Sequence, residues 1–466
     1  MSISDYLRQQ HILIDSPCGG AGKCGGCKVL IWSKDEPEKS KRYVLACQTE
    51  MEDNLVVQYR GVEVSGESVA EIPVEFNPEW REGPQLLAVD LGSTTIAVKN
   101  LTTGETAVGE NHQRTYGHDI ISRIDAAVRG YGRELRDLMV RDLTDLGERV
   151  HFRGGKILIS GNTAMEHLLE GQDVTGLSKA PFQPGDITYH RLGEENIYLM
   201  PGFSAFVGGD IVSGVYKLDM DLSEEYNLLL DLGTNGEMVL GNRDGFYITS
   251  TAAGPAFEGG NIKRGVAGIP GAITDVNIKK GFSRVETIDG KPAVGICGAG
   301  VVSACANLIL DGDMDRSGLL AEEYREDGFV LYRRMQGDEI YFTQEDIRQV
   351  QLAKAAIRAG IEILIASSGI RIEEIAHVYL AGGLGNAISV EAAVQIGLLP
   401  EELANRVVAV SNTSLGGAER FLREESSENG ALDLQARMKK IPGMAKEILL
   451  ANHEDFEKYY LQYLNF

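Results

Sequence analysis

Two stretches of the chain repeat one pattern, and this repeat limits the possible fold more than any other feature. Residues 86–105 (LLAVDLGSTTIAVKNLTTGE) and 228–246 (LLLDLGTNGEMVLGNRDGF) each contain an apolar strand ending in Asp-Leu-Gly, a polar turn and a returning strand. Apolar runs bounded by Gly-containing turns are typical of β-hairpins. Self-similarity at this spacing predicts two related lobes, each with a sheet and flanking helices.

Helix-forming segments fill the intervals around these hairpins. They are predicted at 118–148, 162–170, 344–368 and 414–424. The segment from 344 follows Thr343, a good N-cap residue, and repeats apolar residues at helical spacing. Residues 377–388 (HVYLAGGLGNAI) predict a strand, a Gly-rich turn and a helix. The alternation of strands and helices predicts an α/β fold.

Both Asp-Leu-Gly turns carry the chemistry of a phosphate site. Backbone N–H groups and Ser/Thr hydroxyls can donate to phosphate oxygens, while Asp90 and Asp231 position Mg2+ directly or through water. The candidate phosphate-binding residues are Gly92, Ser93, Thr94 and Thr95 in the first turn and Gly233, Thr234, Asn235, Gly236 and Glu237 in the second. Ordinary hairpins of an α/β protein are the alternative. The P-loop pattern GxxxxGK[ST] is absent from the sequence.

Two further carboxylates are candidates for the same chemistry. Asp210 follows two glycines and either positions Mg2+ or the attacking water, or satisfies backbone amides at a helix N-terminus. Glu258, in GPAFEGGNIKRGVAG, is either a base near the γ-phosphate or part of the loop structure. His112, His118 and His167 lack metal-ligand spacing and are predicted to be surface or core residues.

Four of the six cysteines lie close together near the N-terminus. Cys18, Cys24, Cys27 and Cys47 follow the spacing C-x5-C-x2-C-x19-C, and four thiolates can hold zinc or an iron-sulfur cluster. The glycines of PCGGAGKCGGC favour a [2Fe-2S] cluster, because they permit a tight loop that turns N–H groups toward bridging sulfides. Structural zinc is the alternative. Cys297 and Cys305 are predicted to pack in a core, with a second cluster as the other possibility.

Composition divides the chain and limits its partners. We expect a [2Fe-2S] module at 1–60, a linker at 61–84 and a two-lobed domain at 85–466. A formal net charge of -23 argues against a nucleic-acid partner. The N-terminus lacks the pattern of a secretion signal, and the longest weakly polar run is too short to span a membrane. The sequence therefore predicts a cytoplasmic soluble protein.

Two resemblances add to this interpretation. PCGGAGKCGGCKV followed by LACQT is similar to ferredoxin domains of the plant and adrenodoxin type, which have a β-grasp fold, here with an abbreviated N-terminus. The paired DLG turns with LAGGLG resemble the nucleotide-binding core shared by acetate and sugar kinases, hexokinase and actin. This second resemblance implies that the two turns bind ATP phosphates across a cleft, and that Gly382, Gly383 and Gly385 admit the adenosine.

The full set of motifs resembles a single family. With SGNTAMEHLLEG, AGPAFEGG and GICGAG, the chain is similar to the reductive activators of corrinoid proteins. The resemblance implies ATP-dependent reduction of a corrinoid protein or corrinoid-dependent methyltransferase from Co(II) to Co(I), with a [2Fe-2S] cluster, ATP and Mg2+. It also implies an electron donor protein, and a homodimer as one arrangement. The alternatives are an ATP-dependent activator of another redox enzyme and a redox-gated small-molecule kinase.

Overall fold

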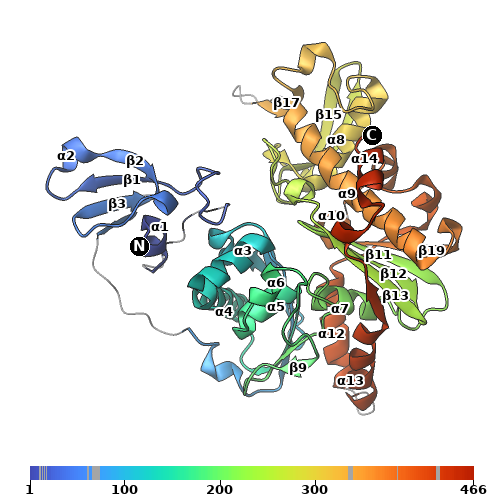
Figure 1. The fold of residues 1–466 in the computed structure, drawn as a ribbon, viewed down its shortest axis with the longest axis horizontal. Coiled ribbons are helices and arrows are strands. Elements are labelled where there is room, and N and C mark those ends of the chain that lie inside the picture. The colour runs from blue at the N-terminus through green and yellow to red at the C-terminus, as the bar shows by residue number, and fades with distance from the viewer. Residues whose placement is uncertain are drawn as a thin grey trace. The chain divides into compact units, whose positions relative to one another are not determined.

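A computed structural model of the chain describes residues 1–9, 12, 14, 16, 18–59, 62–65, 74–333, 339–385, 387–426 and 431–466. Internal contacts divide these residues into two compact units, Met1–Asp210 with Ala418–Lys439, and Ile211–Gly417 with Lys440–Phe466. Each unit contains a six-stranded sheet, and the first also contains a separate four-stranded sheet at the N-terminus (Figure 1). The chain therefore passes from the first unit to the second, returns to the first at residues 418–439 and ends in the second.

The N-terminal sheet packs on one short helix. Its strands, in the antiparallel order β2-β1-β3-β4, are β1 (Lys28–Ser33), β2 (Arg42–Leu45), β3 (Leu55–Tyr59) and β4 (Val62–Ser65). Alternate residues of β3 are buried, and Val57 packs with Ile3 and Leu7 of helix α1 (Ile3–Gln9). Helix α2 (Pro37–Ser40) and the 3-10 helix η1 (Ala46–Gln48) complete this module.

The segment predicted as a linker, 61–84, contains more structure than its composition indicates. Strand β4 (Val62–Ser65) pairs with β3, and Trp80 in the 3-10 helix η2 (Pro78–Trp80) is buried with its ring 5.3 Å from that of Phe152. Residues 61 and 66–73 lie outside the described residues. Strand β4 forms a hairpin with the preceding strand β3, whereas Trp80 packs against Phe152, which is distant in sequence.

The first lobe is a mixed sheet covered by helices. Its strands, in the order β7-β6-β5-β8-β10-β9, are β5 (Gln85–Leu91), β6 (Thr95–Asn100), β7 (Thr106–Glu110), β8 (Gly155–Gly161), β9 (His190–Arg191) and β10 (Ile197–Leu199). Strands β5, β6 and β7 form the predicted antiparallel meander, and β8 joins β5 in parallel. Ion pairs of Lys99 with Glu419 (2.8 Å) and Lys156 with Glu425 (2.5 Å) hold helix α12 (Thr413–Glu425) in this unit.

The helix predicted at 118–148 is interrupted in the structure. It consists of α3 (Ile120–Ala126), a π-helical segment (Ala127–Tyr131) and α4 (Gly132–Arg149). Gly130 within the π-helical segment has a φ of 108°, a conformation that glycine adopts without steric cost. A helical pattern in the sequence does not reveal this interruption. The other helices of the lobe are α5 (Thr163–Glu170), α6 (Thr175–Ser178) and α13 (Ala431–Lys440).

The second unit repeats the strand plan of the first. Its main sheet has the order β20-β19-β11-β12-β13-β21, with β11 (Tyr226–Leu232), β12 (Gly236–Asn242), β13 (Gly245–Thr251), β19 (Ile375–Ala381), β20 (Val407–Ala409) and β21 (Ala445–Glu447). Strands β11, β12 and β13 form a meander, and β19 joins β11 in parallel. The predicted repeat is therefore confirmed at the level of strand order and direction.

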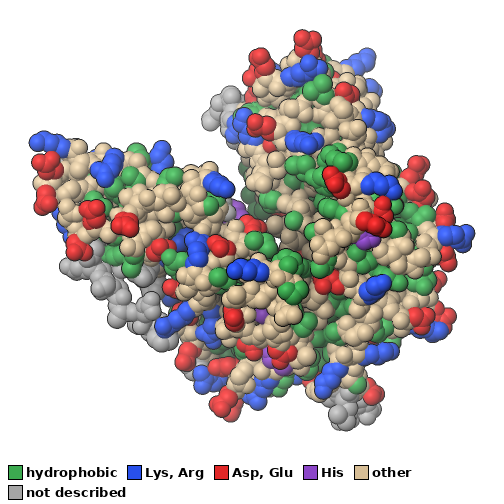
Figure 2. All heavy atoms as spheres, in the orientation of Figure 1, with side chains coloured by type: hydrophobic (Ala, Val, Ile, Leu, Met, Phe, Trp, Pro, Cys, Tyr) green, Lys and Arg blue, Asp and Glu red, His purple; other side chains and the backbone are tan. Residues whose placement is uncertain are grey.

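Smaller elements and helices complete the second unit. The strands are β14 (Ala272–Lys279), β15 (Phe282–Thr287), β16 (Gly295–Ile296), β17 (Phe329–Arg333) and β18 (Glu339–Phe342), and the helices are α7 (Gly209–Lys217), α8 (Gly298–Asp311), α9 (Gln344–Ser368), α10 (Gly382–Gly385), α11 (Val390–Gln395) and α14 (Phe456–Gln462). Apolar residues of the sheet, α8 and α9 share one core. Among the described helices, none is long and apolar enough to cross a membrane. Acidic and basic side chains are interspersed on the face shown in Figure 2.

Helix α9 follows its sequence signals closely. A capping box between Thr343 and Asp346 starts the helix, and Gly369 ends it with a φ of 72°. Figure 1 shows α9 running alongside the sheet of the second unit, where it contacts β12 and β13. Its Lys354 is fully buried, donates to the carbonyl oxygen of Asn465 and lies 5.1 Å from the centre of the Phe466 ring.

The buried Lys354 makes stability depend on pH. Burial, together with the charge of Arg358, lowers the pKa of Lys354 to about 7, whereas a lysine in an unfolded chain titrates near ~10.4. Between these values the unfolded chain binds the extra proton, so stability rises with pH. We expect the free energy of unfolding of the wild type, relative to Lys354→Met, to increase from pH 7 to pH 9 in urea titrations. The exposed Lys458→Met is the control, and a pH-independent difference for Lys354→Met would contradict the lowered pKa.

Candidate functional site

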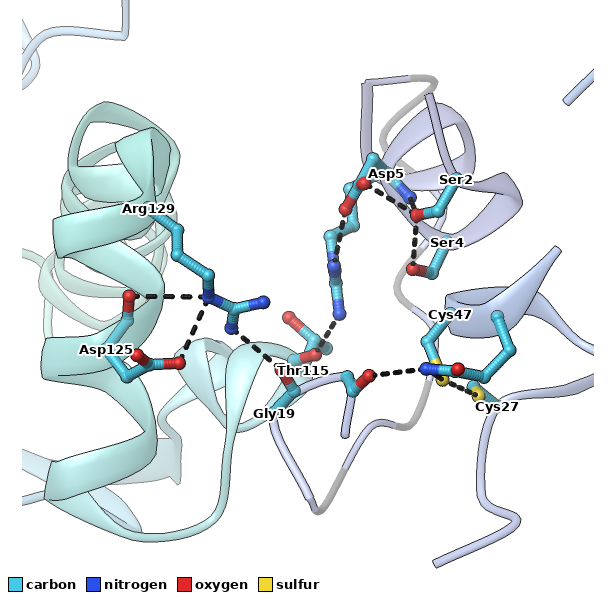
Figure 3. A network of polar contacts seen from close by, with 12 residues as sticks. Ser2, Ser4, Asp5, Gly19, Cys27, Cys47, Thr115, Asp125 and Arg129 are labelled. Carbon is cyan, nitrogen blue, oxygen red and sulfur yellow. Dashed lines mark hydrogen bonds and ion pairs between the residues drawn. The ribbon is translucent and has the colours of Figure 1, made fainter. Parts of the chain in front are cut away.

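The four N-terminal cysteines form two close pairs. The sulfur atoms of Cys18 and Cys24 are 3.3 Å apart, and those of Cys27 and Cys47 are also 3.3 Å apart (Figure 3 shows the second pair). Two thiolates bound to one tetrahedral metal at ~2.3 Å lie about 3.7 Å apart, so each pair has nearly the spacing that one metal ion requires. Within the described ranges, no three metal-binding side chains surround a single ion. One pair for each of two irons fits this arrangement better than a single zinc ion does.

The cysteine loop turns its backbone toward the sulfur of Cys18. Four of its glycines have positive φ angles, namely Gly19, Gly20, Gly22 and Gly25. Burial raises the pKa of the Cys18 thiol, but hydrogen bonds from Cys24 and from the backbone of Lys23 and Gly20 outweigh it and lower the pKa to about 6. Such donors stabilise a thiolate, which is the form that binds metal. The loop therefore has the chemistry expected of a cluster site.

Exposure differs between the two sides of this site. Cys27 is buried, whereas Cys24 is exposed. The N–H group of Gly26 donates to the sulfur of Cys24 at 3.4 Å. Gln48 closes another side, since its amide nitrogen donates to the carbonyl oxygen of Gly20 at 3.0 Å and to the sulfur of Cys47 at 3.7 Å. The site thus opens to solvent at Cys24.

The first predicted nucleotide turn is held by a residue that sequence reasoning missed. Asp90 lies next to the end of β5, and a Cβ atom on Gly92 would lie 2.4 Å from the carbonyl oxygen of Thr95. The buried Asn111 donates its side-chain N–H to the carbonyl oxygen of Gly92 (2.9 Å), and its backbone N–H to that of Thr94 (3.0 Å). Its only sequence signal is its place as an N-cap, which does not indicate these contacts.

Asp210 lies at the same edge of the first sheet as Asp90. Asp90 is opposite Ser160 in the parallel pair β5–β8, and the hydroxyl of Ser160 donates to the carbonyl oxygen of Gly209 at 3.1 Å. Asp210 is in the first turn of α7. The loop approaches closely because Gly208 lacks a side chain: a Cβ there would lie 2.5 Å from the backbone nitrogen of Thr163.

Glu166 is a buried carboxyl at this edge that the sequence analysis did not select. It accepts a hydrogen bond from the N–H of Gly161 at 3.0 Å. Burial first, and then the charge of Asp210, raise its pKa well above the ordinary range of a glutamate. Its neighbours at helical spacing, Asn162, Thr163 and Glu170, are also polar, so the sequence carries no clear signal for its burial.

The second turn brings three predicted segments together. Asp231 near the end of β11 is opposite Ala381 of β19, so the Gly382 turn starts beside it. A Cβ atom on Gly382 would lie 2.7 Å from a carboxylate oxygen of Asp231. The hydroxyl of Thr234 donates to Glu258 at 2.5 Å, which links the turn to the 3-10 helix η5 (Pro255–Glu258).

The remaining candidates take the following positions. Glu237 lies opposite Asp231 on β12, and the N–H of Gly233 donates to the carbonyl oxygen of Asn235 at 3.0 Å. Gly383 is exposed and Gly385 is buried in α10. Ser93 and Thr95 lie in or next to the first turn, and Gly236 begins β12. Asp90 and Asp210 belong to one unit, and Asp231, Glu258 and Gly382 to the other.

The other cysteines and histidines have structural surroundings. Cys297 caps α8 and donates to the carbonyl oxygen of Ile273 at 3.2 Å, and Cys305 is fully buried, as their predicted packing role requires. His112 contacts Asp142 at 2.6 Å. His167 accepts from the N–H of Gly185 at 2.8 Å.

Comparison with known families extends over the whole fold. Residues 225–466 match the family described as the C-terminal domain of RACo, the ASKHA domain, and residues 86–223 match the RACo middle region. The chain belongs to the RACo family. Residues 1–52 match the 2Fe-2S iron-sulfur cluster binding domain. The predicted combination of an N-terminal iron-sulfur domain with an actin- and hexokinase-like nucleotide-binding fold is confirmed.

Individual relatives share most of this architecture. The chain is 29% identical over 422 residues to the corrinoid activation enzyme RamQ of Eubacterium limosum, covering 80% of this chain and 69% of that protein. It is 30% identical over 292 residues to a [Co(II) methylated amine-specific corrinoid protein] reductase of Methanosarcina barkeri, covering 58% of this chain and 51% of that protein. The solved structure of a reductive activator for corrinoid, iron-sulfur protein has a TM-score of 0.73 and 26% identity, covering 100% of this chain and 95% of that one.

The cysteine assignment can be tested by metal content. We expect anaerobically purified wild type to carry about two irons and two acid-labile sulfides per chain, and Cys24→Ser to lose at least about half of the iron, because one thiolate pair is broken. Cys297→Ser, which keeps a donor to the carbonyl of Ile273, is the control and retains the full content. Stoichiometric zinc without sulfide in the wild type would refute the assignment.

The contact between Gly382 and Asp231 can be tested with a single methyl group. Gly382→Ala should weaken binding of ADP by about tenfold or more, or ~1.4 kcal/mol, because its Cβ pushes the turn away from Asp231. Gly312→Ala is the matched control: it shares a positive φ of 87° but meets no atom within 4 Å. Isothermal titration calorimetry measures both, and equal affinities would show that the contact does not shape the nucleotide site.

Proposed function

We propose that this protein binds and hydrolyses ATP to reduce a corrinoid protein of a methyltransferase system from Co(II) to Co(I). The observation that carries the proposal is the presence, on one chain, of a paired four-thiolate site and two aspartate-containing nucleotide turns. The relatives named as corrinoid-activating enzymes support the choice of substrate. When bound, a [2Fe-2S] cluster supplies a group that accepts and releases one electron.

The need for ATP follows from the energetics of the electron transfer. Reduction of Co(II) takes one electron, which we assign to an electron donor protein. For a single electron, about 60 mV of unfavourable potential corresponds to roughly 1.4 kcal/mol. When nucleotide changes the affinity of this protein for its corrinoid partner, the change in binding free energy is of similar size to this cost. ATP turnover can therefore drive a moderately unfavourable reduction.

Each nucleotide-site residue has a proposed role. Asp90 and Asp231 bind Mg2+, directly or through water, and Asp210 positions the metal or the attacking water. Backbone and hydroxyl donors of the two turns, including Thr94 and Thr234, bind the phosphates. The glycines of the Gly382–Gly385 turn admit the adenosine.

Glu258 is the proposed general base. A water oxygen forms a bond to the γ-phosphorus, the bond from that phosphorus to the β,γ-bridging oxygen breaks, and ADP leaves. Glu258 accepts the proton released by the water. The hydrogen bond from Thr234 holds one oxygen of this carboxylate in place.

The partner surfaces follow from the same proposal. The corrinoid protein approaches the cysteine site from its solvent-exposed side at Cys24, since the buried Cys27 lies on the other side. A homodimer is compatible with this arrangement but is not required by it, because all four cysteines come from one chain.

The activity can be tested with isolated components. Holoprotein, a chemical reductant, Mg-ATP and a corrinoid protein from a methyltransferase system should convert the Co(II) absorbance to that of Co(I), and omission of ATP should slow this at least about tenfold. Glu258→Gln should lower ATP hydrolysis about 100-fold while binding ADP normally, because general bases contribute 10²–10⁴. The exposed Glu454→Gln is the control.

Two results would indicate a function other than the one proposed. An unchanged Co(II) spectrum with every corrinoid protein tested would reject the proposed substrate, and stimulation of a different redox enzyme would replace it. Formation of a phosphorylated metabolite at a rate unaffected by Cys24→Ser would indicate a small-molecule kinase.

A further inference from the structure

The cysteine module contacts the first lobe through a small set of polar groups. We define the cysteine module as α1, the Cys18–Cys27 loop and β1–β4. Arg8 of α1 donates to the carbonyl oxygen of Thr115 at 2.7 Å and lies 4.1 Å from the centre of the Tyr116 ring. From the lobe, Arg129 donates to the carbonyl oxygen of Gly19 at 2.9 Å (Figure 3). Gly19 itself packs on Tyr116, since a Cβ atom there would lie 3.0 Å from the Tyr116 carbonyl oxygen.

Most of these contacts converge on one short helix. Thr115 and Tyr116 are the last two residues of the 3-10 helix η3 (His112–Tyr116). The N-cap of η3 is Asn111, the residue that donates to the carbonyl oxygens of Gly92 and Thr94 in the first nucleotide turn. One end of η3 therefore holds the nucleotide turn, and its other end holds the cysteine module.

Hydrogen bonds with two further helices, α3 and α4, keep η3 in place. The fully buried Arg123 of α3 donates to the carbonyl oxygen of Gly117 at 2.9 Å, directly after η3. Asp142 of α4 accepts from the backbone N–H of His112 at 2.9 Å. Gln113 donates to the carbonyl oxygen of Leu135 at 2.8 Å. Because closely packed elements transmit displacement instead of absorbing it, a shift at Asn111 reaches Thr115 and Tyr116.

We propose that η3 couples the first nucleotide turn to the cysteine module, and that Asn111, Arg8 and Arg129 are its positioning residues. When the turn closes on phosphate oxygens, the two hydrogen bonds from Asn111 to the turn are held in place, and η3 moves less. The contacts of η3 with Arg8 and Gly19 are stabilised as a result. The inference rests on the proposed binding of nucleotide at this turn. It goes further in assigning a route, within one unit, by which nucleotide alters the surroundings of the cysteine loop.

Coupling of this kind is reciprocal. If nucleotide stabilises the docked cysteine module by a given factor, a variant that releases the module must lose nucleotide affinity by the same factor. Typical couplings are about 5- to 150-fold. Arg8 is the best site for such a variant, because its described partners are Asp5, Thr115 and Tyr116 and none of them belongs to the nucleotide turn.

Hydrogen exchange of the full-length holoprotein tests the proposal. A non-hydrolysable ATP analogue with Mg2+ should slow amide exchange at residues 18–27 about fivefold or more in the wild type. In Arg8→Gln the slowing should fall below about twofold, and the affinity for the analogue should fall by the factor lost. Arg129→Gln, which removes the bond to Gly19, is a second variant if Arg8→Gln does not fold. Arg149→Gln removes a bond to the Val108 carbonyl oxygen in the same lobe and should behave as wild type.

The outcomes separate this proposal from the proposed function. It is overturned if the analogue does not bind, if it binds without changing exchange at residues 18–27, or if both arginine variants respond as the wild type does. If the protein reduces a corrinoid protein but amide exchange at residues 18–27 is unchanged, the proposed function stands and the coupling through η3 is wrong. If exchange slows but no corrinoid protein is reduced, the coupling through η3 stands and only the assigned substrate is wrong.

Discussion

The positions of the nucleotide-site residues depend on one parallel strand pairing in each lobe. Strand β5 pairs with β8 so that Asp90 lies opposite Ser160, and β11 pairs with β19 so that Asp231 lies opposite Ala381. The backbone that leaves the second strand of each pair must therefore turn within about 5 Å of an aspartate. A slip of one residue would move either aspartate to the other face of its sheet. The backbone hydrogen bonds of each parallel pair thus determine where its aspartate lies relative to the turn that follows the neighbouring strand.

At the first of these pairs, the carboxyl of Glu166 lies close to that of Asp210. Glu166 and Asp210 would repel each other if both were ionised, and Glu166 is also removed from water. Burial and the charge of Asp210 both raise the pKa of Glu166, so the protonated form of this carboxyl is favoured over the form an exposed glutamate would take. The Glu166 carboxyl gives the backbone N–H of Gly161 a buried hydrogen-bond acceptor at 3.0 Å.

Local signals in the sequence were sufficient for some elements and not for others. The hairpins at Asp90 and Asp231, helix α9 and the cysteine cluster each follow from short-range patterns, since alternation, caps and spacing act within a few residues. The burial of Trp80 depends on Phe152, far along the chain, and the roles of Asn111 depend on contacts with Gly92 and Thr94 that its own neighbours do not indicate. The return of residues 418–439 to the first unit has no local signal either. The contacts that hold the site residues in position are therefore the main feature that the sequence could not predict.

The exposure of Cys24 allows a partner protein to approach the cysteine loop, and it also allows oxidants to reach it. Cys24 is exposed while Cys27 is buried, so the sulfur of Cys24 is the one that an approaching electron acceptor reaches most directly. Small molecules reach the same sulfur by the same route. Exposure favours oxidation of a cysteine, so dioxygen and peroxide reach Cys24 more readily than the buried Cys27. Access for a protein partner and resistance to oxidation are therefore opposing demands on a single cysteine.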